Sequence, residues 1–260
     1  THLARVANDA MTEMCSRHPD RFVGYAAALC MKDMDGAMKE LHRAVGELGA
    51  RGVQIFTNVD GEPLDQEKFE PLFAAMAEYD LPIWMHPARG AEISDYRSEK
   101  RGRYEMWWCF GWPYETSIAM TRLVFSGLFD RHPGIKIVTH HMGGMIPFFD
   151  GRIGPGMDVL GARTTDEDYS DVLSSLKRPH GEYFKMFYGD TAMFGAQAAS
   201  QAGLDFFGAG NSFFASDCPY DLSGGEDLIR STIEVIETLR CEDSDRQAIY
   251  EDNTRKLLGL

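Results

Sequence analysis

Basic side chains are scarce in this sequence. The 260-residue chain has 26 lysines and arginines against 40 aspartates and glutamates, a formal net charge of −14. Surfaces that bind nucleic acid need clustered lysine and arginine to contact phosphates, so this balance argues against a nucleic-acid partner. An acidic enzyme that acts on a small molecule fits the composition better.

Cysteine is also scarce, and no two cysteines have Cys-x-x-Cys spacing. The five are scattered along the chain: Cys15, Cys30, Cys109, Cys218 and Cys241. An odd and dispersed set excludes a disulfide framework and a thiolate zinc site as interpretations. We therefore expect a reduced, cytoplasmic protein.

Long apolar runs are missing as well. No run reaches the roughly 18 residues needed to span a bilayer, and no signal-peptide pattern opens the chain, so we expect no membrane partner. The apolar fraction of 44% is enough for one large core, and α/β barrels reach this size as one domain. We expect a single domain over 1–260. Because the chain opens without methionine and directly in a helical pattern, we also expect that an upstream segment is missing.

Strand-like and helix-like segments alternate along the chain. Apolar runs predict strands at 22–29, 52–57, 81–86, from Ile135, at 183–188 and at 211–216. Helical spacing predicts helices at 1–17, from Asp33 or Asp35 to 48, at 69–79, from Pro113 to 129, at 226–239 and at 245–258. This alternation favours an α/β fold with a parallel sheet or barrel. Six strands are two short of a (β/α)8 barrel, so strands 1 and 2 are expected to be missing at the amino end.

Three of the predicted strands end in side chains that can bind a metal or move a proton. His86 ends one strand, His140 and His141 follow the next, and Asp217 follows the last. In a parallel barrel these ends meet on one face, where imidazoles and a carboxylate suit zinc or manganese. A lone strand-end histidine is more often a hydrogen-bonded structural residue, and His140 is interpreted in this way.

Other residues near these strand ends are candidates for the rim of the site. Asn58 and Asp190 each stand just past a predicted strand. Gly143 and Gly144 are expected to let the backbone pass close to a bound group. The long aromatic and charged segment 87–111 is typical of a functional loop or lid.

Three motifs resemble one known family. IWMHPARG (83–90), WPYETSIAMTRLVFSGLFDRHPGIKIVTHHMGG (112–144) and FFASDCPYD (213–221) are similar, in order and spacing, to the amidohydrolase-2 branch of the metal-dependent amidohydrolase superfamily. That branch contains the aminocarboxymuconate-semialdehyde, γ-resorcylate and 5-carboxyvanillate decarboxylases. The resemblance implies a distorted (β/α)8 barrel with one divalent metal ion at its mouth, zinc first and manganese as the alternative.

The resemblance also implies roles for individual residues. His86 matches a metal ligand, and Asp217 matches the aspartate that binds the metal or its water and can donate a proton. His141 matches the catalytic histidine. The family supplies two more ligands from strand 1, as His-x-His or Glu-x-His, and none of the predicted strands here has that motif. The metal is therefore expected to be weakly bound or absent in this chain.

Arginine and tryptophan side chains are candidates for binding the substrate. The guanidinium groups of Arg89 and Arg152 match a carboxylate in charge and geometry. Arg152 resembles an arginine that aminocarboxymuconate-semialdehyde decarboxylases present to the neighbouring subunit, which implies a homodimer or higher homo-oligomer; the alternative is an ordinary surface arginine. Trp112, with aromatic neighbours at 107–110, either forms a wall for a planar ring or packs a lid.

Three functions follow, in order of preference. The first is a metal-dependent, non-oxidative decarboxylase of a small, aromatic carboxylic acid. The second is a metal-dependent hydrolase of a lactone or amide, because the same side chains could activate water. The third is a catalytically inactive scaffold, if the strand-1 ligands are truly absent.

Overall fold

A parallel sheet forms the centre of the molecule. The computed structural model describes residues 1–164 and 166–260. Six strands stand in chain order and each neighbouring pair is parallel. They are β1 (Ala27–Ala28), β2 (Val53–Phe56), β5 (Ile83–His86), β6 (Ile137–Thr139), β7 (Tyr188–Asp190) and β8 (Ser212–Phe213). The predicted α/β class is confirmed, and consecutive parallel strands with intervening helices are the arrangement of a (β/α)8 barrel.

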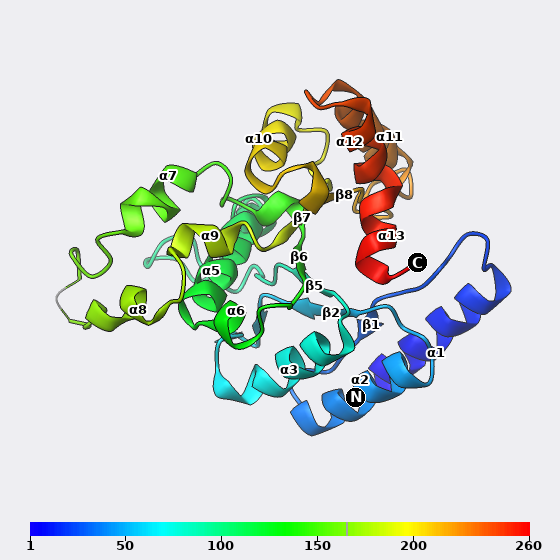
Figure 1. The fold of residues 1–260 in the computed structure, drawn as a ribbon, viewed down its shortest axis with the longest axis horizontal. Coiled ribbons are helices and arrows are strands. Elements are labelled where there is room, and N and C mark those ends of the chain that lie inside the picture. Colours follow the sequence, from blue (N-terminus) through cyan, green and yellow to red (C-terminus); the bar gives the residue numbers. More distant parts are fainter. Residues whose placement is uncertain (165) are drawn as a thin grey trace.

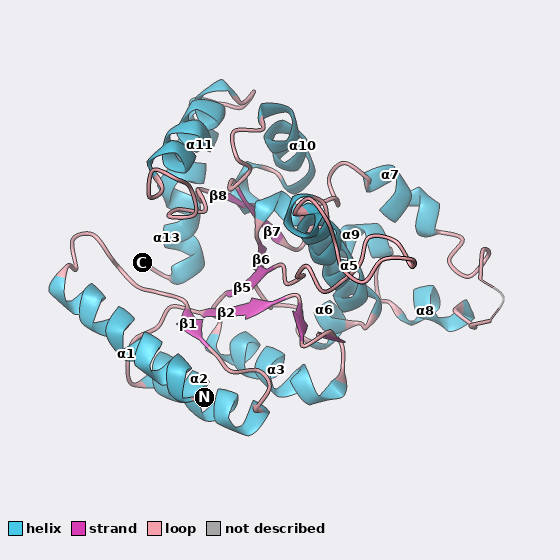
Figure 2. Cartoon of the chain, turned by 180° about the vertical axis from the view of Figure 1, so that it is seen from behind, coloured by secondary structure: helices cyan, strands magenta, loops and turns pink. Residues whose placement is uncertain are grey.

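Helices surround this sheet, as Figure 1 and Figure 2 show from opposite sides. The α-helices are α1 (His2–Arg17), α2 (Met34–Gly46), α3 (Glu70–Tyr79), α4 (Met106–Cys109), α5 (Gly111–Phe125), α6 (Leu128–Arg131), α7 (Asp150–Ile153), α8 (Ser170–Ser175), α9 (His180–Phe184), α10 (Gln197–Phe207), α11 (Glu226–Thr238), α12 (Asp243–Gln247) and α13 (Asn253–Leu258). Short elements are η1 (Glu67–Phe69), η2 (His141–Gly143), η3 (Pro155–Met157), η4 (Ala209–Asn211), the π-turn η5 (Ala248–Asp252) and the hairpin β3 (Asn58–Val59) with β4 (Glu62–Pro63). Among the described residues, no helix is both long and apolar enough to cross a membrane.

Alternation along β2 and β5 decides which side chains enter the core and which face the other way. Val53 and Ile55 are buried in the main apolar core, whereas Phe56 is 51% exposed. Phe56 pairs in register with His86. Because successive side chains of a strand point to opposite faces, His86 lies on the same face as Phe56, away from the packed core.

Most predicted helices are confirmed to within two residues at each end. They include those predicted at 1–17, 69–79 and 226–239. Asp33 is the N-cap of α2, where its side chain accepts a hydrogen bond from the backbone of Gly36 at 3.0 Å. The predicted helix from Pro113 to 129 is two helices, because Gly127 adopts a left-handed conformation (φ 73°) between α5 and α6.

The strand predicted at 183–188 is wrong for most of its length. Tyr183 and Phe184 end α9, and β7 begins only at Tyr188. Tyr183, Phe184 and Phe187 are all buried. Their spacing of one and then three residues fits one side of a helical turn better than a strand, whose buried side chains would recur every second residue.

A buried asparagine joins α1 to the first strand. Asn8 is fully buried. Its side-chain amide donates to the carbonyl of Ala28 at 3.1 Å and to Glu40 at 2.8 Å, and its oxygen accepts from the N–H of Ala28 at 2.8 Å. Both backbone polar groups of Ala28 therefore have side-chain partners from α1 on the side of β1 opposite β2.

We expect Asn8→Ala to lower the free energy of unfolding by about 2–4 kcal/mol, because it leaves buried polar groups on Ala28 and Glu40 without partners. Urea unfolding measures the change. Asn211→Ala is the matched control, since the Asn211 amide makes one longer hydrogen bond, 3.3 Å to the Lys185 carbonyl. Equal losses in the two variants would contradict a special role for Asn8.

Candidate active site

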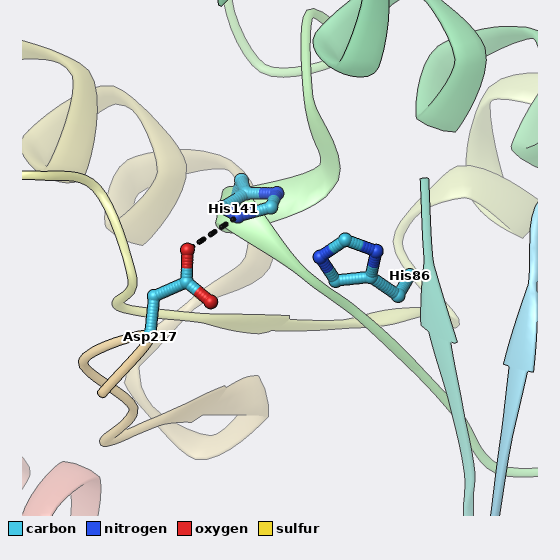
Figure 3. Close-up of side chains that lie close together, drawn as sticks. All are labelled: His86, His141 and Asp217. Atoms are coloured by element: carbon cyan, nitrogen blue, oxygen red, sulfur yellow. Dashed lines mark ion pairs between the residues drawn. The ribbon is translucent and has the colours of Figure 1, made fainter. Parts of the chain in front are cut away.

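Three side chains from separate strand ends meet in one place. His86 is the last residue of β5, His141 follows β6, and Asp217 follows β8. Their potential ligand atoms all lie within 4.8 Å of one another, and Figure 3 shows the three side chains facing a common space. The sequence placed these residues at converging strand ends, and the structure brings them together. Their individual roles stay predictions.

The donor set fits a divalent cation. Nε2 of His141 is buried and has no hydrogen-bond partner among the described residues; it lies 3.5 Å from a carboxylate oxygen of Asp217. Nδ1 of His86 lies 2.8 Å from the carbonyl of Pro87, and no hydrogen bond joins Nε2 of that ring to another of the described residues. Two imidazole nitrogens and one carboxylate oxygen at this separation are suitable ligands for zinc or manganese.

Burial and neighbouring charges set the protonation of these groups. Burial, together with the nearby His140 and His141, lowers the pKa of His86 to about 4. The imidazole is then neutral at neutral pH, which is the form that binds metal ions. The adjacent His141 lowers the pKa of Asp217, against the opposing effect of burial.

The backbone around the cluster is strained. His141 (φ 55°), Met142 (φ 53°), Phe194 (φ 51°) and Asp217 (φ 64°) are all non-glycine residues in the left-handed region. Each such conformation costs free energy and persists only where surrounding contacts fix it, a pattern typical of functional sites.

The glycines after His141 serve packing between elements. At Gly144 a Cβ atom would lie 2.4 Å from the carbonyl oxygen of Pro113 in α5, and at Gly143 it would lie 2.7 Å from the Phe207 ring of α10. The space that these residues leave is occupied by α5 and α10. Packing against these helices is sufficient to account for glycine at both positions, and a close approach of this backbone to a bound group stays a prediction.

Aromatic rings form one side of the site. The Trp112 ring lies 5.1 Å from His86, edge to face, and 6.2 Å from His141 with an interplanar angle of 22°. Its indole N–H donates to the carbonyl of Arg89 at 3.1 Å. Phe194 is stacked on His141 at 6.1 Å and 24°. The sequence analysis identified Trp112 but missed Phe194, because a single phenylalanine in a loop gives no signal of its own.

The two predicted substrate-binding arginines lie outside the cluster. The Arg89 guanidinium is 3.1 Å from the carboxylate of Glu115, and both side chains are only 18% exposed. They line a cleft of about 1340 Å³ beside β1 and β2 whose walls do not include the cluster. Arg152 is exposed on α7, with its guanidinium 5.8 Å from the Phe149 ring. Their assignment to substrate binding stays a prediction.

Comparison with known proteins identifies the family. A family model described as Amidohydrolase matches residues 1–260. The chain belongs to this amidohydrolase family. The resemblance inferred from the three motifs is therefore confirmed.

The relatives of this amidohydrolase include several decarboxylases. The γ-resorcylate decarboxylase of Rhodococcus jostii is 39% identical over 268 residues, which cover 99% of this chain and 77% of the relative. A dihydroxybenzoic acid decarboxylase from Polaromonas sp. JS666, solved with manganese and 2-nitroresorcinol, has a TM-score of 0.78 at 28% identity and covers 99% of this chain and 75% of its own. The 5-carboxyvanillate decarboxylase of Novosphingobium aromaticivorans, solved with manganese and 4-hydroxy-3-methoxy-5-nitrobenzoic acid, has a TM-score of 0.83 at 25% identity, with coverage of 100% and 70%. Bound manganese in these structures is consistent with a divalent ion at the cluster.

Asp221 fixes the loop that follows Asp217. Its carboxylate accepts hydrogen bonds from the backbone N–H groups of Ser223 (2.8 Å), Gly225 (2.6 Å) and Leu228 (2.9 Å). Burial would raise the pKa of Asp221, but the backbone donors of Gly225 and Leu228 outweigh it and hold the pKa at about 2. The ionised carboxylate therefore stabilises the start of α11.

We expect this stabilisation to depend on pH in one direction. Because the folded-state pKa of Asp221 lies below the ordinary value of 3.8, the contribution is fully present above pH 4 and is lost as the pH falls toward about 2. Urea unfolding of Asp221→Asn and the parent should show a less stable variant at pH 6 and converging stabilities near pH 2. A stability difference that does not change with pH would contradict this assignment.

Proposed function

We propose that this protein is a metal-dependent, non-oxidative decarboxylase of a small aromatic carboxylic acid. The observation that supports it most directly is the cluster of His86, His141 and Asp217, with ligand atoms within 4.8 Å of one another, beside the stacked rings of Trp112 and Phe194. The relatives named above act, by their names, on hydroxylated or methoxylated benzoic acids.

His86 and Asp217 are the residues proposed to hold the metal ion. A bound divalent ion would supply positive charge that orients adjacent oxygens of the substrate and stabilises developing negative charge. Zinc, which the family resemblance implies first, and manganese, which the solved relatives bind, both suit this donor set. Loading the protein with each ion in turn distinguishes them.

Proton delivery is the task of the chain's own residues. The reaction places a proton on the ring carbon that bears the carboxylate, after which the carbon–carbon bond breaks, carbon dioxide leaves and the ring regains its aromaticity. Asp217 is the proposed donor. Since its pKa is lowered, it must first receive a proton, and His141, 3.5 Å away, is the neighbour placed to supply it.

Trp112 and Phe194 are proposed to flank the substrate ring. Both lie against His141 with nearly parallel planes, and flat apolar surfaces favour a planar aromatic ligand over an extended chain. Arg89 and Arg152 remain candidates for the substrate carboxylate. For Arg152, exposed on α7, the proposal includes a homodimer in which it reaches the neighbouring subunit's site.

Isotope incorporation tests the reaction type. Protein loaded with Mn²⁺ or Zn²⁺ in D2O, and given a panel of hydroxybenzoates, should release carbon dioxide and yield a product with one deuterium at the carbon that held the carboxylate. Chelation should abolish the activity, and re-addition of the metal should restore it. Lactone or amide opening without carbon dioxide would favour the hydrolase alternative, and inactivity of metal-loaded protein on both panels would favour the scaffold.

His141→Gln tests the proton-transfer role. We expect kcat to fall by about 10²- to 10⁴-fold, the usual contribution of a general acid or base, while metal content measured by elemental analysis stays near that of the parent. His132→Gln is the matched control, because the His132 imidazole pairs with Glu70 rather than with the cluster. Parent-like kcat in His141→Gln would remove His141 from the mechanism.

A further inference from the structure

Asp190 is a buried carboxylate with partners on two different loops. It is the last residue of β7 and is 2% exposed. One of its oxygens accepts hydrogen bonds from the backbone N–H groups of His141 (2.9 Å) and Ala192 (3.2 Å). The other lies 2.8 Å from Nδ1 of His140. A buried charge is costly unless paired and hydrogen-bonded, and Asp190 has both kinds of partner.

The first loop holds His141. Both His141 and Met142 adopt left-handed conformations, which are unfavourable for side chains of this size. The hydrogen bond from the His141 N–H to Asp190 lies at the first of these two residues. Removing the acceptor would leave a buried N–H group without a partner in this left-handed turn.

The second loop holds the ring that packs on His141. The Ala192 N–H bonds to Asp190 two residues before Phe194, which is itself left-handed and stacks on the His141 imidazole at 6.1 Å. The same carboxylate therefore contacts both the backbone of His141 and the loop that carries the ring packed on its side chain.

His140 connects Asp190 to the metal-ligand candidate. Its ring lies 5.1 Å from that of His86, edge to face. Its other nitrogen, Nε2, is buried and has no hydrogen-bond partner among the described residues. Among the described residues, the polar partner of this ring is therefore Asp190, and the ring links Asp190 to His86 by contact.

We infer that Asp190 is a positioning residue for the proposed decarboxylation, acting through His140, the His141 backbone and the loop to Phe194. This inference rests on the proposed function. Asp190 is not one of the three cluster side chains; its proposed effect is to hold His141 in its position relative to His86 and Asp217. Carboxylates that orient site histidines from behind typically contribute 10- to 100-fold to activity or metal affinity.

Two substitutions at Asp190 test the inference through kinetics. Asp190→Asn keeps an oxygen for the N–H groups of His141 and Ala192 but loses the charge that pairs with His140, and we expect kcat to fall about 10-fold. Asp190→Ala loses every partner, and we expect a fall of about 100-fold or more. In both, KM should stay within about threefold of the parent, since positioning of a proton-transfer group affects the chemical step more than substrate binding.

Asp130→Asn is the matched control. Asp130 is a partly buried carboxylate that also joins two segments, accepting from the Tyr183 hydroxyl at 2.6 Å and the Lys177 N–H at 3.0 Å. It lies in α6, which precedes β6, at the opposite end of the strand from His141. We expect its kcat within twofold of the parent even where its stability falls.

NMR of the metal-free protein supplies a readout that does not depend on activity. With 15N-labelled histidine, the His141 ring resonances should shift in Asp190→Asn, and the ring nitrogen resonances of His140 should shift as well, because its ion pair with Asp190 is lost. Both should be unchanged in Asp130→Asn. If Asp190→Ala does not fold, Asp190→Asn decides the question.

The two proposals can fail separately. Parent-like His141 resonances in a folded Asp190→Asn protein would overturn the positioning role, whatever the enzyme catalyses, and so would kcat within twofold of an active parent. An inactive parent whose His141 resonances still shift on substitution would overturn the decarboxylase proposal alone.

Discussion

Parallel pairing of β5, β6, β7 and β8 is the constraint on which the site depends. Each of these strands has only two to four residues, yet their parallel order places all their carboxyl ends at one edge of the sheet. His86, His141 and Asp217 are far apart in sequence and would have no reason to meet in an antiparallel arrangement. The sheet topology is therefore the first cause of the short distances, within 4.8 Å, between their potential ligand atoms. Local contacts only refine these distances.

Local contacts then convert this approximate convergence into a defined geometry. Left-handed residues at 141, 142, 194 and 217 turn the chain sharply as it leaves the sheet. Such turns hold only where packing and buried hydrogen bonds outweigh their cost. Here α5 and α10 fill the space beside Gly143 and Gly144. The Asp190 carboxylate accepts hydrogen bonds from the backbone N–H groups of His141 and Ala192. Buried contacts behind the site therefore orient its side chains, which exposed loops alone could not hold in place.

The sequence was sufficient for features that depend on local patterns. The strand that ends in His86 and the one that precedes Asp217 are recognisable because parallel folds use strand ends for chemistry. Asp33 was one of the two residues predicted as a helix cap. Features that depend on tertiary neighbours were not predictable. The aromatic run around Tyr183 suggested a strand, and nothing in the residues around Phe194 indicates that it meets the loop after β6. Asp190 was predicted at the rim of the site, but its partners on two loops were not. Predicting these features requires knowledge of which helix or loop packs against each residue in the folded chain.

Charge at the site links the fold to the chemistry. Asp217 has a lowered pKa, His86 is neutral at neutral pH, and the Arg89 guanidinium is already paired with Glu115. A carboxylate substrate that approaches Asp217 would therefore meet like charge with little positive charge from these side chains to offset it. The protein as a whole is also strongly acidic. A divalent cation held by His86 and Asp217 would reverse the sign of the local potential and would attract an anionic substrate. Binding of such an ion would also account for neutral histidines, rather than arginines, at these strand ends.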